Sequence, residues 1–164
     1  MKLYFRPFTC SLAARIALIE GELDADFVRV EPGRPLRDGR LFTEISPMGY
    51  VPAIETRAGF VLSEGPAVLT YIAELAPEGV LAPPAFSDAH YRMLAWLNFV
   101  ATELHARVFT PLLGPASEDE RRSARARVAA PFGVLCAHLE THDHLEGDFS
   151  VADAYLLAVL NWCE

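Results

Sequence analysis

The sequence has few cysteines, few basic residues and no long apolar run. Its three cysteines are widely spaced and form no C-x-x-C pair, so we expect reduced thiols rather than a disulfide scaffold. Acidic residues outnumber basic ones by 22 to 14, and the net charge of −8 argues against non-specific binding to nucleic acid or to an anionic membrane. No stretch is long enough for a membrane span, and the N-terminus lacks the apolar core of a signal peptide. We therefore expect a soluble, cytoplasmic protein.

What is present is typical of a folded globular chain: 52% of the 164 residues are apolar and 22% are charged. A chain of this length forms about one domain, or two small cooperating ones. It can bury roughly two-thirds of the surface that its unfolded form exposes. The chain is therefore long enough for a substantial hydrophobic core.

Strand and helix patterns alternate along the first eighty residues. Short apolar or alternating stretches predict strands at 2–5, 27–30, 52–55 and 60–62. Apolar residues at helical spacing predict a helix between Cys10 and Gly21, and a short helical piece is expected at 41–45. Another helix opens with Pro66 in its first turn. The order β-α-β-α-β-β-α predicts a small α/β domain over 1–76.

A Pro-rich stretch at 77–86 predicts a linker, and the pattern beyond it is helical throughout. Helices are expected from a cap at Ser87 to about Phe109, from Glu118 to about His142, and from the capping box Ser150–Asp153 to Glu164. The predicted buried side of the first of these is Tyr91, Leu94, Ala101, Leu104 and Val108. Residues 87–164 are therefore predicted to form an all-α domain.

Cys10 lies at the predicted start of the first helix. Unsatisfied N–H groups and the positive end of the helix dipole favour an anion there, so a thiolate would be stabilised. Neighbouring Ser11 could cap the helix or donate a hydrogen bond to a bound thiolate. The alternative is a buried, inert cysteine, because free cysteines are commonly core residues. The position at a helix start favours the functional interpretation.

Two further stretches of the first domain could hold a ligand. A cis Val51-Pro52 bond would turn the backbone of Val51 outward, where an extended peptide could pair with it; an ordinary edge proline is an equal alternative. At Glu64-Gly65, the N–H groups that open a helix would bind a carboxylate, while the Glu64 side chain would bind a cation. A site for a carboxylate next to a site for a cation fits the head group of an α-amino acid. Without further context, however, ordinary helix capping by Glu64 is the favoured interpretation.

The polar residues of the helical domain are weaker candidates. Asn98, Thr102 and His105 share one helix face, from which His105 could donate to a sulfur, but such a stripe is more often solvated. One cysteine and three histidines further along suggest zinc, but a second pair of ligands with the required spacing is missing. These residues are Cys136, His138, His142 and His144. We expect a solvated helix end there and no metal site.

Several motifs, in one order along nearly the whole chain, resemble those of cytosolic glutathione S-transferases, most of all the bacterial beta class. They are the stretch 2–13 with its Cys-Ser-Leu-Ala end, Ser-Pro-x-Gly-x-Val-Pro at 46–52, Ser-Glu-Gly at 63–65, Trp-Leu-Asn-Phe at 96–99, Glu-Leu-His at 103–105, and residues 149–156. Each motif alone is weak, but six in the family's order are specific.

The resemblance implies a thioredoxin-like N-terminal domain, an all-helical C-terminal domain, and a homodimer with glutathione as co-substrate and no metal. By position, Cys10 would contact the glutathione sulfur or form a mixed disulfide with it. Val51 would pair with the cysteinyl part of the tripeptide, before a cis Pro52. Glu64 and Gly65 would hold the γ-glutamyl end.

In the helical domain, the resemblance places Asn98 and His105 near the thiol and the second substrate. Two departures from the family stand out. Pro35 occupies the place of a lysine that usually meets the glycyl carboxylate, so Arg34 is the expected substitute. The chain also ends inside the capped helix, before the closing helices that the family usually has. Two alternatives follow: the chain is a fragment, or it is a shortened member whose electrophile site is open or lost.

The leading hypothesis is a glutathione transferase that acts in detoxification. The glutathione thiolate, stabilised at the first helix start, would attack a small electrophile. Thiol–disulfide exchange through Cys10 would be a second activity. The alternative is a non-catalytic relative that binds a ligand or a partner protein through the same fold. A thioredoxin-type oxidoreductase is disfavoured because Ala13 stands where a resolving cysteine would be.

Overall fold

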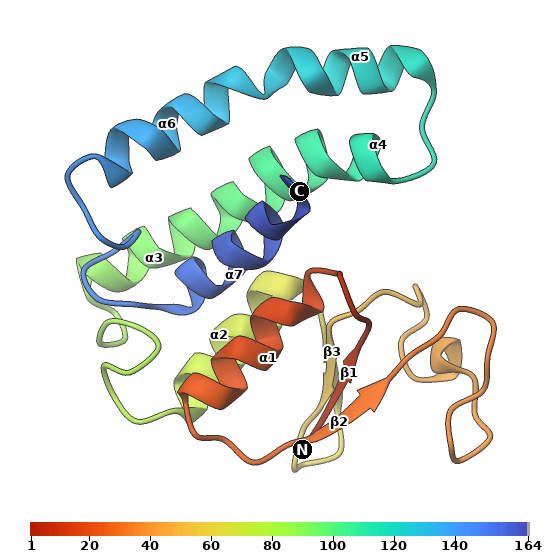
Figure 1. The fold of residues 1–164 in the computed structure, drawn as a ribbon. Coiled ribbons are helices and arrows are strands. Elements are labelled where there is room, and N and C mark those ends of the chain that lie inside the picture. The colour runs from red at the N-terminus through yellow and green to blue at the C-terminus, as the bar shows by residue number, and fades with distance from the viewer. Residues whose placement is uncertain (164) are drawn as a thin grey trace.

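The computed structural model describes residues 1–163, which form an α/β half and a helical half (Figure 1). The sheet consists of β1 (Lys2–Phe5), β2 (Asp26–Arg29), β3 (Ala53–Glu55) and β4 (Val61–Ser63). Its strand order is β2-β1-β3-β4, with β2 parallel to β1 and the other two pairs antiparallel. The predicted order of strands and helices is confirmed, and every strand lies within one residue of its expected bounds.

Alternation along β1 sends its side chains to two different layers. The helices of this half are α1 (Ser11–Glu20), the short 3₁₀ helix η1 (Phe42–Glu44) and α2 (Gly65–Leu75). Leu3 and Ile54 belong to the main core, together with buried residues of α1 and α2. Tyr4 lies on the other face, where Phe42 of η1 packs on it with ring centroids 5.3 Å apart. The sheet is therefore covered on both faces, by helices on one and by the long β2–β3 connection on the other.

The helical half contains α3 (Asp88–Phe99), the π-helix η2 (Val100–Phe109), α4 (Thr110–Leu113), α5 (Glu118–Arg127), α6 (Ala129–Leu139), α7 (Val151–Leu160) and the 3₁₀ turn η3 (Asn161–Cys163). The first three follow one another without a break. Ser87 caps this long helix as predicted, because its Oγ accepts the N–H of His90 at 3.1 Å. Among the described residues, no helix is both long and apolar enough to cross a membrane.

The buried side of this long helix differs from the prediction at its N-terminal end. Tyr91 is exposed and Leu94 is only partly buried, whereas Met93 and Leu97 are fully buried. The buried residues repeat at ordinary helical spacing back from Leu104, as Val100, Leu97 and Met93. Tyr91 and Leu94 lie off this stripe, so the prediction placed the buried side wrongly at the N-terminal end.

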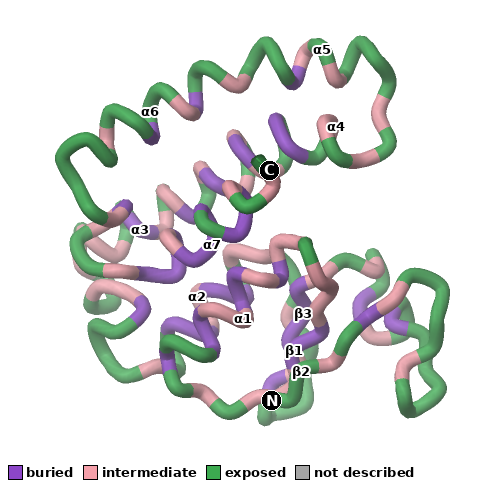
Figure 2. Tube along the Cα trace, in the orientation of Figure 1, coloured by how far each residue is buried: buried purple, intermediate pink, exposed green. Residues whose placement is uncertain are grey.

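The single helix predicted from Glu118 to about His142 is instead two helices, α5 and α6, which are separated at Val128. Pro131 is the reason, since a proline has no N–H to donate and its ring clashes with the carbonyl of the residue four positions earlier, here Arg127. Figure 2 shows that α5 and α6 are mostly exposed, whereas buried residues gather where α1, α2, α3 and α7 meet.

The capping box that starts α7 is confirmed. The Asp153 carboxylate accepts hydrogen bonds from the N–H and the hydroxyl of Ser150, at 2.9 and 2.8 Å, and from the N–H of Leu145 at 2.8 Å. The N–H of Val151 donates to the carbonyl of Leu81 at 2.9 Å, which ties α7 to the segment between the halves. One continuous core therefore holds α7 against α1 and brings the two halves together.

Candidate functional site

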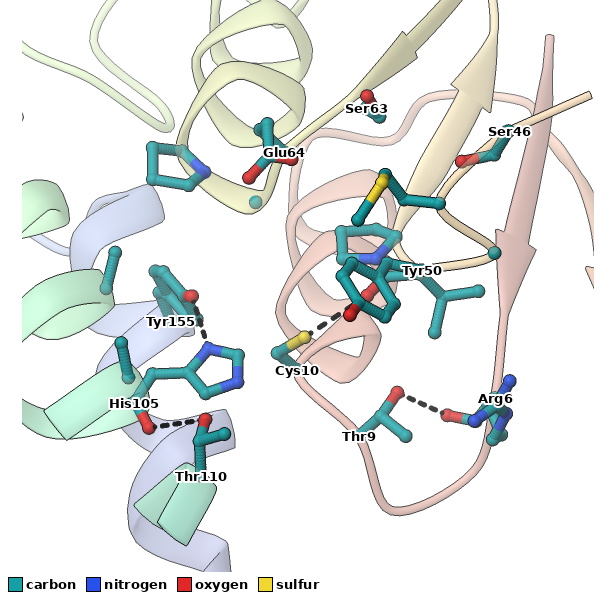
Figure 3. A pocket seen from close by; sticks show the side chains of 18 residues that line it. Arg6, Thr9, Cys10, Ser46, Tyr50, Ser63, Glu64, His105, Thr110 and Tyr155 are labelled. Atoms are coloured by element: carbon teal, nitrogen blue, oxygen red, sulfur yellow. Dashed lines mark hydrogen bonds between the residues drawn. The ribbon is translucent and has the colours of Figure 1, made fainter. Parts of the chain in front are cut away.

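A cavity of about 500 Å³ lies between the two halves, a volume suited to a small ligand (Figure 3). The loop after β1, the segment before β3 and the start of α2 line one side of the cavity, and η2 and α7 line the other. Of the residues predicted for the site, those that line it are Cys10, Val51, Pro52, Glu64, Gly65 and His105. Six residues that the sequence scattered over nearly one hundred positions therefore meet in one place.

Cys10 occupies the N-cap position of α1, and its Sγ donates to the carbonyl of Val51 at 3.3 Å. Burial raises the pKa of the Cys10 thiol to about 11, and the Glu64 carboxylate raises it slightly further. The N–H groups of Cys10 and Ser11 lower this pKa, in the direction that a helix start predicts, but their effect is smaller than that of burial. The expectation of a Cys10 thiolate is therefore wrong for the free protein, in which this thiol is protonated at neutral pH.

Ser11 is fully buried and does not line the cavity. Its Oγ donates to the carbonyl of Arg6 at 3.0 Å, accepts the N–H of Arg6 at 3.1 Å, and lies 2.7 Å from Thr9 Oγ1. The hydroxyl therefore closes the loop between β1 and α1. Both predicted roles of Ser11 need correction, because Cys10 holds the cap position and the hydroxyl has no route to a bound thiolate.

The Val51-Pro52 peptide bond is cis, which decides between the two alternatives that the sequence left open. Val51 accepts a hydrogen bond from Cys10 through its carbonyl, while its own N–H has no partner within residues 1–163. A free N–H at the edge of a cavity can pair with the backbone of an extended peptide.

Glu64 stands at the N-cap of α2 with a φ of +71°, a conformation that side-chain-bearing residues rarely adopt. Such backbone strain is concentrated at functional sites. The Glu64 side chain makes no capping hydrogen bond and lines the cavity, so its carboxylate is available to a ligand. At Gly65, a Cβ would lie 3.3 Å from Tyr155 Oη, so the absence of a side chain lets α2 approach α7 closely.

On the opposite side of the cavity, His105 Nδ1 lies 2.8 Å from Tyr155 Oη. The indole of Trp162 packs against the His105 ring, with centroids 5.0 Å apart, and Thr110 Oγ1 donates to the carbonyl of His105 at 2.9 Å. Burial lowers the pKa of His105, so the neutral imidazole predominates at pH 7. Burial also raises the pKa of Tyr155 well above its usual range, so this phenol stays protonated. The pair can act as hydrogen-bond donor and acceptor without carrying charge.

Two predicted ligand contacts lie outside the cavity. Arg34 is exposed in the β2–β3 connection and pairs with Glu31 at 3.4 Å. Asn98 is exposed on α3, and its side chain donates to the carbonyl of Leu94 at 2.8 Å. Asn98 lies about two helical turns before His105, and of the predicted polar stripe only the histidine lines the cavity.

The polar residues that line the cavity and that the prediction missed include Arg6 and Tyr155. Arg6 directly follows β1, so its position at the end of a predicted strand could have identified it. Its Nε is buried and has no hydrogen-bond partner within residues 1–163. Tyr155 carries no such signal, since it lies fifty positions from His105 in an apolar helix.

The histidines near the end of α6 do not form a metal site. Across residues 1–163, no group of three or more His, Cys, Asp or Glu side chains could hold a metal ion. The rings of His138 and His142 instead stack with centroids 4.3 Å apart, and His138 Nε2 lies 3.1 Å from the carbonyl of His144.

The sequence matches two family models along most of its length: the N-terminal domain of glutathione S-transferase over residues 9–75 and the C-terminal domain over residues 89–164. Glutathione S-transferase GstA of Escherichia coli O157:H7 is 36% identical over 165 residues, which cover 99% of this chain and 82% of that protein. Among solved structures, a sphingomonad glutathione S-transferase in complex with glutathione has a TM-score of 0.92 and 40% identity. The beta-class enzyme of Sphingomonas chungbukensis has a TM-score of 0.91 and 38% identity, and both cover 99% of this chain and 82% of their own.

Proposed function

This chain belongs to the glutathione S-transferase family and is a glutathione transferase, and we propose that its interdomain cavity holds glutathione with the sulfur beside Cys10. The observation that carries this assignment is the free Glu64 carboxylate at the start of α2. Glu64 would bind the ammonium of the γ-glutamyl group, and the N–H groups that open α2 at Gly65 would bind its carboxylate. The cysteinyl backbone would pair with the unpartnered N–H of Val51.

Arg6 would bind the glycyl carboxylate, the role that the sequence suggested for Arg34. Two observations support this choice: Arg6 lines the cavity, and its guanidinium forms no ion pair within residues 1–163. Figure 3 shows Arg6 well apart from Glu64, with Cys10 and Tyr50 between them. The two charged side chains would therefore recognise opposite ends of an extended tripeptide.

In the reaction, the glutathione thiol loses its proton, its sulfur forms a bond to a small electrophile, and the leaving group departs with the bonding electrons. On binding, the protonated Cys10 thiol would turn from the carbonyl of Val51, its acceptor in the free protein, and donate its hydrogen bond to the attacking sulfur rather than attack by itself. Exchange with glutathione disulfide needs a Cys10 thiolate, and a pKa of about 11 leaves very little of this form at neutral pH. Conjugation is therefore favoured over thiol–disulfide exchange.

The proposal extends to the organisation of the protein. We propose an α/β domain over residues 1–76, a linker over 77–86 and a helical domain over 87–164, and we propose that the protein is a homodimer. Phe60 and Val61 support the dimer, since both are exposed and Val61 lies on the edge strand β4, where a second copy could cover them. Sedimentation velocity should then give twice the chain mass of 18.1 kDa. A cytoplasmic location also belongs to the proposal, supported by the three free cysteines.

Calorimetric titration of reduced glutathione tests the assignment of the site. The wild-type chain should bind saturably, and Glu64→Ala should weaken binding by roughly 100-fold, because a charged pair in a partly buried site contributes about 2–5 kcal/mol. Glu74→Ala removes an exposed carboxylate of the same helix and should leave binding unchanged. A folded wild-type chain that fails to bind would overturn the proposed site, as would equal loss in both variants.

A further inference from the structure

Tyr155 approaches His105 from a different helix, and the two side chains share one hydrogen bond in the cavity wall (Figure 3). Tyr155 comes from α7 and His105 from η2. The phenol is almost fully buried, with 3% of the residue exposed, and the bond to His105 is the only hydrogen bond of its hydroxyl within residues 1–163. The His105 Nε2 has no partner within the same residues. The direction of this single hydrogen bond therefore decides whether His105 Nε2 presents a proton or a lone pair to the cavity.

Two arrangements of the protons are conceivable. If Nδ1–H donated to the phenol oxygen, the Tyr155 proton would have no acceptor among residues 1–163 and would depend on the contents of the cavity for one, which is the less favourable arrangement in the free protein. If the phenol donates to a bare Nδ1, its proton is satisfied, and the remaining imidazole proton resides on Nε2, which is free to meet a ligand. The neutral state of His105 and the protonated state of Tyr155 are both consistent with the second arrangement.

We propose that Tyr155 is a positioning residue that holds His105 in its Nε2–H tautomer, so that the imidazole donates a hydrogen bond to the sulfur of bound glutathione. This inference rests on the proposed function, because it needs the sulfur to lie beside Cys10. His105 then stabilises the thiolate as a donor and is not the base that removes the thiol proton. The thiol proton leaves to solvent through the open side of the cavity.

The surroundings hold the pair in this arrangement. The missing Cβ of Gly65 leaves room for Tyr155 Oη, and the Trp162 indole packs on the His105 ring. Cys10 and Glu64 are the titratable groups that face Tyr155 from the other half, and the Cys10 thiol is already directed to the carbonyl of Val51. On η2 itself, the charged side chains near His105 are Glu103 and Arg107, which pair with each other at 2.7 Å. None of these groups forms a competing hydrogen bond with the phenol.

Nitrogen-15 NMR of the imidazole groups tests the tautomer directly, because protonated and bare ring nitrogens have different chemical shifts. In the free wild-type chain, Nε2 of His105 should carry the proton and Nδ1 should be bare; the spectrum of His105→Gln identifies the signals. This measurement needs no activity, so it stays valid if glutathione does not bind. A proton on Nδ1 would overturn the proposal, as would an unchanged tautomer in Tyr155→Phe.

A double-mutant cycle tests the consequence for catalysis. Tyr155→Phe should raise the pKa of the bound glutathione thiol and lower kcat at pH 6.5 by about three- to tenfold, as expected for one hydrogen bond, with KM for glutathione within twofold. In a His105→Gln background, the amide always presents N–H groups, so the same substitution should change kcat by less than twofold.

Tyr91→Phe is the matched control, since Tyr91 is exposed on α3, and it should leave kcat and the thiol pKa unchanged. A merely structural role for Tyr155 predicts the same loss in both backgrounds and no change in the thiol pKa. Either of these results would overturn the inference. If instead the wild-type chain shows no glutathione binding, the proposed function fails, while the tautomer reading still decides the role of Tyr155.

Discussion

The two walls of the cavity are assembled in different ways. The N-terminal wall consists of Arg6, Cys10, Val51, Glu64 and Gly65, which stand in short segments whose backbone shape is set by neighbours close in sequence. The helical wall consists of His105 and Tyr155, whose relation depends on the packing of α7 beside η2. Local motifs therefore identify most of the first wall, whereas half of the second is invisible without the tertiary structure.

Two opposing effects, one local and one tertiary, act on the pKa of Cys10. At Cys10, the N–H groups of the helix start lower the pKa of the thiol, and burial raises it. Burial is the stronger effect, so tertiary packing reverses a property that the local motif predicts. Four experiments test how far each wall depends on local or on distant interactions.

The largest effect is expected for the reactivity of Cys10. At pH 7.5 it should react with iodoacetamide roughly 100-fold more slowly than exposed Cys136, because a pKa of about 11 leaves little thiolate. The thiolate fraction grows with pH, so the rate at Cys10 should rise about tenfold per pH unit up to about 11. Mass spectrometry of the labelled peptides measures both rates. Equal labelling of the two cysteines at pH 7.5 would show that the helix start, not burial, controls Cys10.

Arg6→Gln should raise KM for glutathione by roughly tenfold or more, since a hydrogen bond to a charged group contributes about 1.5–3 kcal/mol. Arg34→Gln is the matched control and should change KM by less than twofold, because Arg34 lies outside the cavity. Steady-state kinetics with glutathione and with its glycyl ethyl ester measure the contact. The Arg6 variant should lose its preference for the free carboxylate; a preference lost only in the Arg34 variant would restore the prediction made from the sequence.

Ser11→Ala should lower the free energy of unfolding by about 2 kcal/mol, because the N–H of Arg6 loses its side-chain partner and the carbonyl of Arg6 keeps only the hydroxyl of Thr9. Ser87→Ala, which removes only a helix cap at the surface, should cost about 1 kcal/mol. Urea unfolding measures both values. Unchanged stability together with loss of activity at saturating glutathione would instead mean that the Ser11 hydroxyl acts on the ligand.

The smallest effect is expected where the two walls touch. Gly65→Ala introduces a Cβ 3.3 Å from Tyr155 Oη, so the phenol must shift by a few tenths of an ångström. We expect a loss of about threefold in kcat/KM, as for a weakened rather than a broken hydrogen bond. Gly133→Ala on α6 meets nothing within 4 Å and should leave activity unchanged while stabilising the chain by up to about 1 kcal/mol. Identical kinetics in the two variants would show that the walls are not coupled through Gly65.

Three predicted site residues do not line the cavity, and their positions show why part of the site cannot be predicted from the sequence. Arg34 depended on the path of the long β2–β3 connection, which has little regular structure to predict. A shared helix face places Asn98 and His105 on one side, but they lie seven positions apart along the axis, and the cavity reaches His105 but not Asn98. Ser11 follows Cys10 directly, yet one step around the helix turns it from the cavity into the core.

The sequence alone determined the order of strands and helices, the segment between the two halves, and the motifs at Cys10, Val51-Pro52 and Glu64-Gly65. Each of these depends on residues within about ten positions, through period, capping and backbone conformation. Only the tertiary structure decided the burial that raises the pKa of Cys10, the position of Arg6 rather than Arg34 at the cavity, and the contact of His105 with Tyr155. These depend on desolvation and on contacts between distant segments, which exist only when the two halves are packed together.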